Sequence, residues 1–263
     1  MHEESQLTAP PLAHRSQRTS LVGTRLGALD CLSNEERSAL ENAVTLSRTI
    51  EAGNTLIREG EATDRLYFLV DGWAYRFKTT SDGGRQIVSI AVPGDAANLD
   101  ALMFERPDYG VRALSKASVL AIPRTRAAAL AAEHAGIAKA FTLLAMLEFK
   151  VLSQWALCLG RLSAQQRLAH LIAELSVRLA CEDGNRSHFE MPLTQEQLAD
   201  CLGLTPVHVN RTLQQLRSDE LIVTGSRRMN IPDVARLRQA GSFHPSYLCL
   251  QPLGDDAVLI GSR

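Results

Sequence analysis

The spacing of hydrophobic residues along this chain changes near residue 123. Between residues 21 and 123 they form short apolar or alternating runs, such as RLYFLVDGW, RQIVSIAV and ASVLAIP, which glycines interrupt. Short alternating runs are typical of β-strands, and glycine accepts the positive φ angles of tight turns. Asp82-Gly83-Gly84, between two such runs, indicates a hairpin. This part of the chain is therefore predicted to form a small β-barrel or roll.

After residue 123 the spacing becomes helical. The chain from Arg124 to about Gly160 is rich in alanine and free of proline, and a further helix is predicted over 161–182 with Ser163 as its N-cap. In the first of these helices, one set of side chains recurs alternately every four and three residues, which favours a narrow seam in a dimer. The alternative is a helix that lies on its own barrel. The seam consists of Ile137, Phe141, Leu144, Glu148, Val151, Trp155 and Cys158.

Residues 193–222 predict two short helices joined by a tight turn. Thr194 and Gln197 have the spacing of a capping box, which begins a helix, and Gly203 stands where a helix-ending glycine belongs. Thr205 can cap the next helix, and the proline that follows loses no needed hydrogen bond in the first helical position. Two such helices make a helix-turn-helix, whose second helix enters the major groove of DNA. An antiparallel helix pair of another all-α domain is the alternative.

The second helix has one apolar side, formed by Val209, Leu213 and Leu216, and one side with groups that can read base edges. Beyond it, residues 223–231 predict a short hairpin, or wing, with two arginines near its tip that suit phosphate contact. The predicted DNA contacts are made by Thr205, Val207, His208, Asn210, Arg211, Gln214, Gln215, Arg227 and Arg228.

The charge of the whole chain at first argues against DNA. It has 28 basic and 29 acidic residues, a formal net charge of −1, whereas DNA binding depends on neutralising phosphates. Between residues 206 and 231, however, four arginines stand against one aspartate and one glutamate, which gives a local charge of +2. The positive charge is thus concentrated in the predicted recognition helix and wing.

From about residue 25 to residue 240, the sequence resembles the Crp–Fnr family of bacterial transcription regulators. The resemblance rests on EGEATDRLYFLVDGWAYRF, SIAVPGD, VRALSKASVLAIPR, the long helix and LTQEQLADCLGLT, in this order. It implies a homodimer that reads a palindromic DNA operator, with half-site centres roughly 34 Å apart, and RNA polymerase as a further partner.

Together with the patterns above, the resemblance predicts an α+β fold. Its parts are a mobile arm (1–20), a cyclic-nucleotide-binding-like sensory roll of the double-stranded β-helix, jelly-roll-like type (21–135), a dimerisation helix (136–160), a winged helix-turn-helix domain (161–240) and a tail (241–263). No run of about 18 uncharged apolar residues is present, and the first residues lack the apolar segment of a signal peptide. We therefore expect a cytoplasmic chain without a membrane partner.

The sequence departs from the family at its sensory sites. Members that bind cAMP hold it with a glycine–glutamate step and an arginine–serine pair, where this chain has Asn98-Leu99 and Pro107-Asp108-Tyr109. The Fnr branch binds an iron–sulfur cluster through several N-terminal cysteines, and here only Cys31 lies in that region. We therefore expect neither cAMP nor an iron–sulfur cluster, and the signal stays open.

Other chemistry has weak support in the sequence. His134 and His170 are available as haem ligands, and Cys158 and Cys181 as redox-active thiols, but all four also suit plain structural roles. No Walker-type loop, nucleophile elbow or metal-ligand cluster appears, so no enzyme is expected. The alternative to a DNA-binding regulator is a small-molecule or redox sensor that acts through a protein partner. In the recognition helix, Val207 stands where many family members have glutamate, so no known half-site is carried over.

Overall fold

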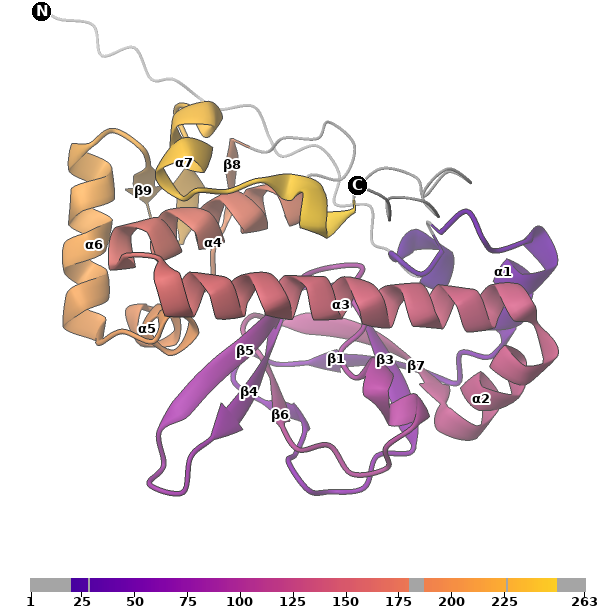
Figure 1. Ribbon diagram of the computed structural model, residues 1–263. Helices are drawn as coiled ribbons and strands as arrows, with labels where there is room; N and C mark the ends of the chain where they lie inside the picture. Colours follow the sequence, from indigo (N-terminus) through magenta and orange to yellow (C-terminus); the bar gives the residue numbers. More distant parts are fainter. Residues whose placement is uncertain (1–19, 28, 180–186, 226, 250–263) are drawn as a thin grey trace, which may run out of the picture.

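The computed structural model describes residues 20–27, 29–179, 187–225 and 227–249. A β-roll lies along one side of a long helix, α3 (Ala135–Arg161), and the helices α4 to α7 gather around the C-terminal end of α3 (Figure 1). The predicted arrangement of roll, long helix and winged helix-turn-helix is confirmed. Among the described residues, no helix is both long enough and apolar enough to span a membrane.

Two antiparallel sheets form the roll, with strand orders β1-β7-β3 and β2-β6-β4-β5. Ile50, Leu69 and Val119 are buried in the cluster between the sheets. In the predicted hairpin, Gly83 has a φ of +87°, and the Thr80 amide donates to the Gly84 carbonyl at 2.8 Å. The strands are β1 (Leu46–Ile50), β2 (Thr55–Ile57), β3 (Arg65–Asp71), β4 (Ala74–Thr79), β5 (Arg85–Ala91), β6 (Gly110–Ala113) and β7 (Ala117–Pro123).

Helices flank the roll on the side of α3. The structure divides the helical stretch after residue 123 into two helices, because the chain is extended at His134. Just beyond this break, the Gly136 amide donates to Glu36 Oε1 at 2.9 Å, and a Cβ on Gly136 would lie 2.4 Å from that carboxylate. The remaining helical elements here are η1 (Leu21–Gly23), α1 (Asn34–Asn42), η2 (Leu99–Leu102) and α2 (Arg124–Glu133).

The C-terminal domain combines helices with a small antiparallel sheet of order β8-β10-β9. The predicted wing is confirmed, since Met229 in β10 is paired with Thr224 in β9. The third strand, β8, was not predicted, because three residues are too few to show a period. The elements are α4 (Ala164–Leu179), β8 (His188–Glu190), α5 (Gln195–Leu202), α6 (Pro206–Ser218), β9 (Val223–Gly225), β10 (Arg228–Asn230), α7 (Val234–Ala240) and η3 (Pro245–Leu248).

The side chains of the predicted dimer seam on α3 face their own chain. Five of the seven are at most 7% exposed in the single chain. The first three pack on the cluster beneath the roll, and the last two on the core of the C-terminal domain or its cavity. Glu148 pairs with an arginine of β4. Of the seam residues, Ile137, Phe141, Leu144 and Glu148 thus fit the alternative, a helix on its own barrel. Val151, Trp155 and Cys158 lie against the cluster and cavity of the C-terminal domain.

The opposite side of α3 carries large exposed side chains. Met146 is 52% exposed, Phe149 63%, Leu152 38% and Leu157 51%. We call these four residues the outer α3 face. In a folded chain that buries most of its large hydrophobic side chains, such a row on one helix is typical of an interaction surface.

Candidate nucleic-acid interface

The two helices α5 and α6 begin and end as their capping residues require. Thr194 Oγ1 accepts from the Gln197 amide at 3.2 Å, and Gln197 Oε1 accepts from the Thr194 amide at 2.9 Å. Gly203 ends α5 in the left-handed region, with a φ of +63°. Thr205 Oγ1 then accepts from the His208 amide at 3.2 Å. The predicted helix-turn-helix is therefore present, with one residue between the glycine and the next cap.

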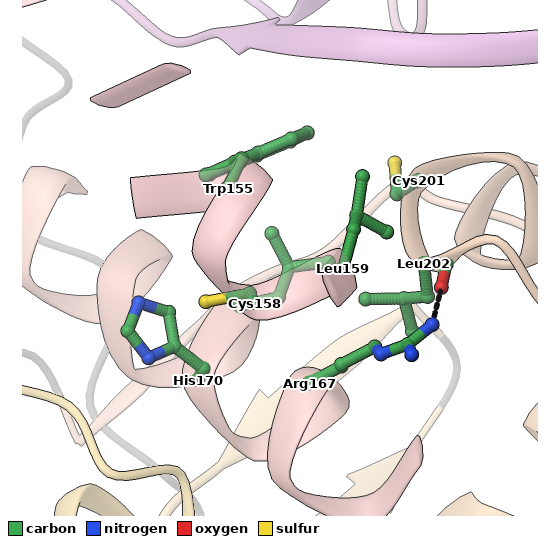
Figure 2. A pocket seen from close by; sticks show the side chains of 8 residues that line it. Trp155, Cys158, Leu159, Arg167, His170, Cys201 and Leu202 are labelled. Atoms are coloured by element: carbon green, nitrogen blue, oxygen red, sulfur yellow. Dashed lines mark hydrogen bonds between the residues drawn. The ribbon is translucent and has the colours of Figure 1, made fainter. Parts of the chain in front are cut away.

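The inner side of α6 packs against α4 and α5. Val209 and Leu216 are fully buried and Leu213 is 5% exposed. Behind the turn, Arg167 of α4 donates to the Leu202 carbonyl at 2.9 Å, as Figure 2 shows. This bond satisfies a carbonyl at the C-terminal end of α5 and ties α5 to α4.

A small cavity lies between α3, α4 and α5, and Trp155, Cys158 and Cys201 are among the side chains that line it (Figure 2). Its volume is about 20 Å³, which is room for about one water molecule. Burial raises the pKa of both cysteine thiols, so each is held as the less reactive thiol. Cys181, the other thiol considered for redox chemistry, lies outside the described residues.

The outer side of α6 presents side chains around a shallow hollow of about 470 Å³. Val207 is 81% exposed, and Arg211 and Gln214, one and two turns further on, are also exposed. Asn210 Nδ2 donates to Gln195 Oε1 of α5 at 3.3 Å. The hollow therefore gathers an aliphatic side chain, a guanidinium group and three amides, and the amide of Gln195 is one that sequence reasoning missed. The signal was its place directly after the Thr194 cap of the first helix.

The other predicted contact residues are not all free to reach a ligand. The hydroxyl of Thr205 is engaged as a helix cap. The side chain of His208 is half-buried and therefore less accessible than that of Arg211. Gln215 Nε2 donates to Asp219 Oδ1 at 2.8 Å, near the C-terminal end of α6. Arg227 and Arg228 are exposed in the wing. The side chains of the first turns of α6 and of the wing are thus more available for contact with DNA than the side chain of Gln215.

The residues at the predicted sensory positions of the roll serve the roll itself. Asn98 is 1% exposed, and its side chain donates to the Arg65 carbonyl and accepts from the Tyr67 amide, both at 2.8 Å. The Tyr109 hydroxyl donates to the Asp100 carboxylate. The side chains of Asn98 and Tyr109 are thus engaged in hydrogen bonds within the roll.

Two further candidate ligands lie elsewhere. Both ring nitrogens of His170 have protein partners, the Gly241 carbonyl at 3.0 Å and the Tyr247 hydroxyl at 3.1 Å. His134 is half-buried at the junction of α2 and α3. Within the described part of the chain, no three histidine, cysteine or acidic residues are grouped as metal ligands would be.

Comparison with known families gives two matches that cover different parts of this chain. The Crp-like helix-turn-helix domain matches residues 166–240, and the cyclic nucleotide-binding domain matches residues 47–134. The first match contains α5, α6 and the wing, and the second contains β2 to β7 and all but the first residue of β1.

Related proteins and one solved structure match about three quarters of this chain. The transcriptional activator protein FnrL of Cereibacter sphaeroides is 29% identical over 209 residues, 78% of this chain and 83% of its own length. The transcriptional activator protein Anr of Pseudomonas protegens is 25% identical over 206 residues, 78% of this chain and 84% of its own. The structure of FixK2 from Bradyrhizobium japonicum superposes with a TM-score of 0.70 at 24% identity, over 76% of this chain and 98% of that one.

Proposed function

The chain belongs to the Crp–Fnr family of transcription regulators, and we propose that it binds a palindromic DNA operator as a homodimer. The observation that carries this proposal is the outer side of α6, where Val207, Asn210 and Arg211 surround a hollow above a fully buried apolar side. We further propose that RNA polymerase is the partner of the bound dimer, and that neither cAMP nor an iron–sulfur cluster is its signal.

The proposed dimer forms through the outer α3 face. Two-fold symmetry places the same patch of both copies against each other, and a palindromic operator requires this symmetry. Met146 and Phe149 would meet their counterparts along the middle of the helix, because large exposed hydrophobic side chains gain most from being covered. The seven residues first predicted as the interface would then hold α3 within each copy, the first of them to the roll and Trp155 and Cys158 to the C-terminal domain.

Base recognition is assigned to the first turns of α6. Arg211 suits the O6 and N7 atoms of guanine, and the amide of Asn210 suits adenine. Gln195 orients the Asn210 amide by accepting a hydrogen bond from its NH2 group. Val207 has no polar atom on its side chain, and in the major groove its methyl groups match the methyl group of thymine.

The contact of Val207 with thymine can be tested by removing single methyl groups from the DNA. Replacing the contacted thymine by deoxyuridine should weaken binding of the wild-type chain about fourfold, as expected for one buried methyl at ~0.8 kcal/mol. Val207→Ala should lose this sensitivity, whereas Val22→Ala, at an exposed valine of the N-terminal segment, should keep it. If Val207→Ala responds to deoxyuridine as the wild type does, Val207 does not read thymine.

The two wing arginines are proposed to contact phosphates. Replacing Arg227 or Arg228 by alanine should weaken binding to all sequences alike and reduce the slope of log K against log salt by about 1. The measurement is an anisotropy titration at several salt concentrations on a specific and a scrambled duplex. An unchanged slope, or a loss confined to one base pair, would show that the wing does not act through phosphates.

The proposed function itself is tested by selecting bound sites from a random DNA library. The purified wild-type chain should enrich a two-fold symmetric sequence. Selections with and without cAMP, and under oxidising and reducing conditions, should return the same sequence if the signal is neither a cyclic nucleotide nor a redox change. Failure to enrich a palindrome under every condition would contradict the proposal.

A further inference from the structure

The chain continues past the winged domain into a segment that packs back onto it. We call residues 241–249 the strap, which begins one residue after the match to the helix-turn-helix family ends. Phe243 is 6% and Leu248 2% exposed, and both lie in the core of the C-terminal domain. In Figure 1 the strap runs beside α4 and reaches α3.

One end of the strap is locked to α4 at His170. A Cβ on Gly241 would lie 2.5 Å from the His170 amide nitrogen, so only glycine permits this close approach. The oxygen of the Gly241 carbonyl lies 3.0 Å from His170 Nδ1. The ring of Phe243 packs edge-on against the His170 ring, with 5.2 Å between the ring centroids. The path of the strap along α4 is therefore defined by backbone, ring and hydrogen-bond contacts.

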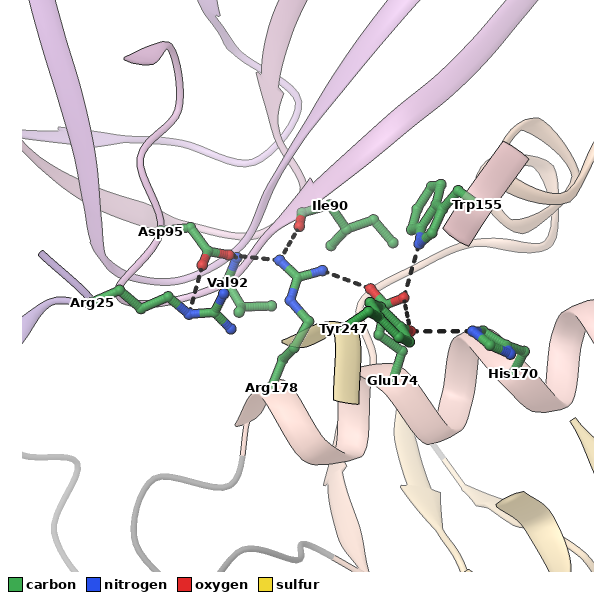
Figure 3. Close-up of polar contacts among 9 residues, drawn as sticks. All are labelled: Arg25, Ile90, Val92, Asp95, Trp155, His170, Glu174, Arg178 and Tyr247. Atoms are coloured by element: carbon green, nitrogen blue, oxygen red, sulfur yellow. Dashed lines mark hydrogen bonds and ion pairs between the residues drawn. The ribbon is translucent and has the colours of Figure 1, made fainter. Parts of the chain in front are cut away.

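The other end of the strap reaches a buried carboxylate that joins three elements, as Figure 3 shows. Tyr247 of η3 donates its hydroxyl to Glu174 Oε2 at 2.7 Å. Trp155 of α3 donates its indole N–H to the same oxygen at 3.0 Å. Glu174 itself belongs to α4 and is fully buried. Because the bonds of a buried carboxylate are strong and directional, this point fixes α4 relative to both α3 and the strap.

The carboxylate of Glu174 is also connected to the roll through Arg178. Arg178 donates to Glu174 Oε1 at 3.0 Å, to Asp95 Oδ2 at 2.7 Å and to the Ile90 carbonyl at 2.6 Å. The side chains of Arg178 and Asp95 are only 5% and 12% exposed. Opposite charges alternate along this path, so each buried ion has a partner, and a shift of α4 would leave at least one of them unpaired.

These contacts matter because α3 and α4 are connected by only two residues, Leu162 and Ser163. The 16 residues of α4 make a lever of roughly 24 Å. A tilt of roughly 8° about the connection would move the far end of this lever, where Arg178 lies, by about 3.4 Å. It would turn α6, which packs on α4, through the same angle. The connection alone cannot hold so fine an angle, whereas contacts far from it can.

We propose that the strap sets the angle of the DNA-binding domain on α3 and thereby fixes the half-site spacing that the dimer accepts. Tyr247 and Glu174 are the positioning residues in this assignment, and neither touches DNA. The inference rests on the proposed function, since only a dimer on a palindrome has a spacing to select.

The test compares affinity for the selected palindrome with affinity for versions that have one or two base pairs added to or removed from the centre. The wild-type chain should bind the native spacing far better than the altered ones. In Tyr247→Phe and in Glu174→Gln, this preference should fall at least fivefold. Affinity for a single half-site should stay within twofold of the wild type, which shows that the recognition helix is still folded.

The matched control is Tyr109→Phe, which removes a part-buried hydroxyl bond inside the roll and should keep the wild-type preference. Trp155→Phe removes the indole donor to Glu174 without touching the strap and should also relax the spacing, because Glu174 then loses its bond to α3. An unchanged spacing preference in Tyr247→Phe would overturn the role of the strap. A wild-type chain that binds single half-sites as well as palindromes would instead overturn the proposed function.

Discussion

Replacing Phe149 by glutamate is expected to convert the dimer into monomers and to abolish tight operator binding. Phe149 is 63% exposed in the single chain and lies between Met146 and Leu152 on the outer α3 face. Symmetry would bring the two new carboxylates together in the covered interface. An uncompensated buried charge costs roughly 3–5 kcal/mol, so the dimer should weaken more than a hundredfold. Sedimentation velocity over a range of protein concentrations measures this directly.

The matched control for this variant is Phe104→Glu. Phe104 is 66% exposed and follows η2 on the roll, away from the outer α3 face, so the same change of side chain should leave the dimer intact. A Phe149→Glu chain that sediments as the wild-type dimer does would show that the two copies meet elsewhere.

Replacing Arg211 by alanine is expected to produce the largest loss of sequence discrimination. A bidentate arginine–guanine contact contributes about 1–3 kcal/mol, so affinity for the selected site should fall roughly 5- to 150-fold. The loss should be confined to one base pair per half-site, because the variant no longer distinguishes the bases there. Binding to the selected site and to every single-base variant of it gives the measurement.

Arg126→Ala provides the control for the loss of one positive charge, since Arg126 lies on α2 and is half exposed. It should leave both affinity and discrimination unchanged. A uniform loss over all sequences in Arg211→Ala would identify Arg211 as a phosphate contact and would leave base reading to Asn210 and Val207.

Local signals were sufficient to predict the helix-turn-helix. Thr194, Gln197 and Gly203 act within a few residues of one another, so their effect on the backbone does not depend on the rest of the fold. The same holds for Thr205 and for the hairpin at Gly83. Gln195 was missed because its role depends on Asn210, which reaches it only once the two helices have packed.

Signals that depend on distant parts of the chain were not readable from the sequence. The spacing on α3 identified a buried stripe correctly but could not say whether the roll or a second copy covers it. Just after the break between α2 and α3, the Gly136 amide is bonded to Glu36, 100 residues away. Likewise, the sequence places Glu174 on an amphipathic helix, where a glutamate is normally exposed. In the structure it is buried and bound by Tyr247, 73 residues later.

In the proposed complex, two copies of α6 are presented together to a symmetric DNA site. The most direct test is the number of chains bound to the selected palindrome, measured by sedimentation equilibrium alongside the affinity for one isolated half-site. We predict two chains per palindrome and much weaker binding to the half-site. One chain per duplex, with equal affinity for the palindrome and the half-site, would contradict the account.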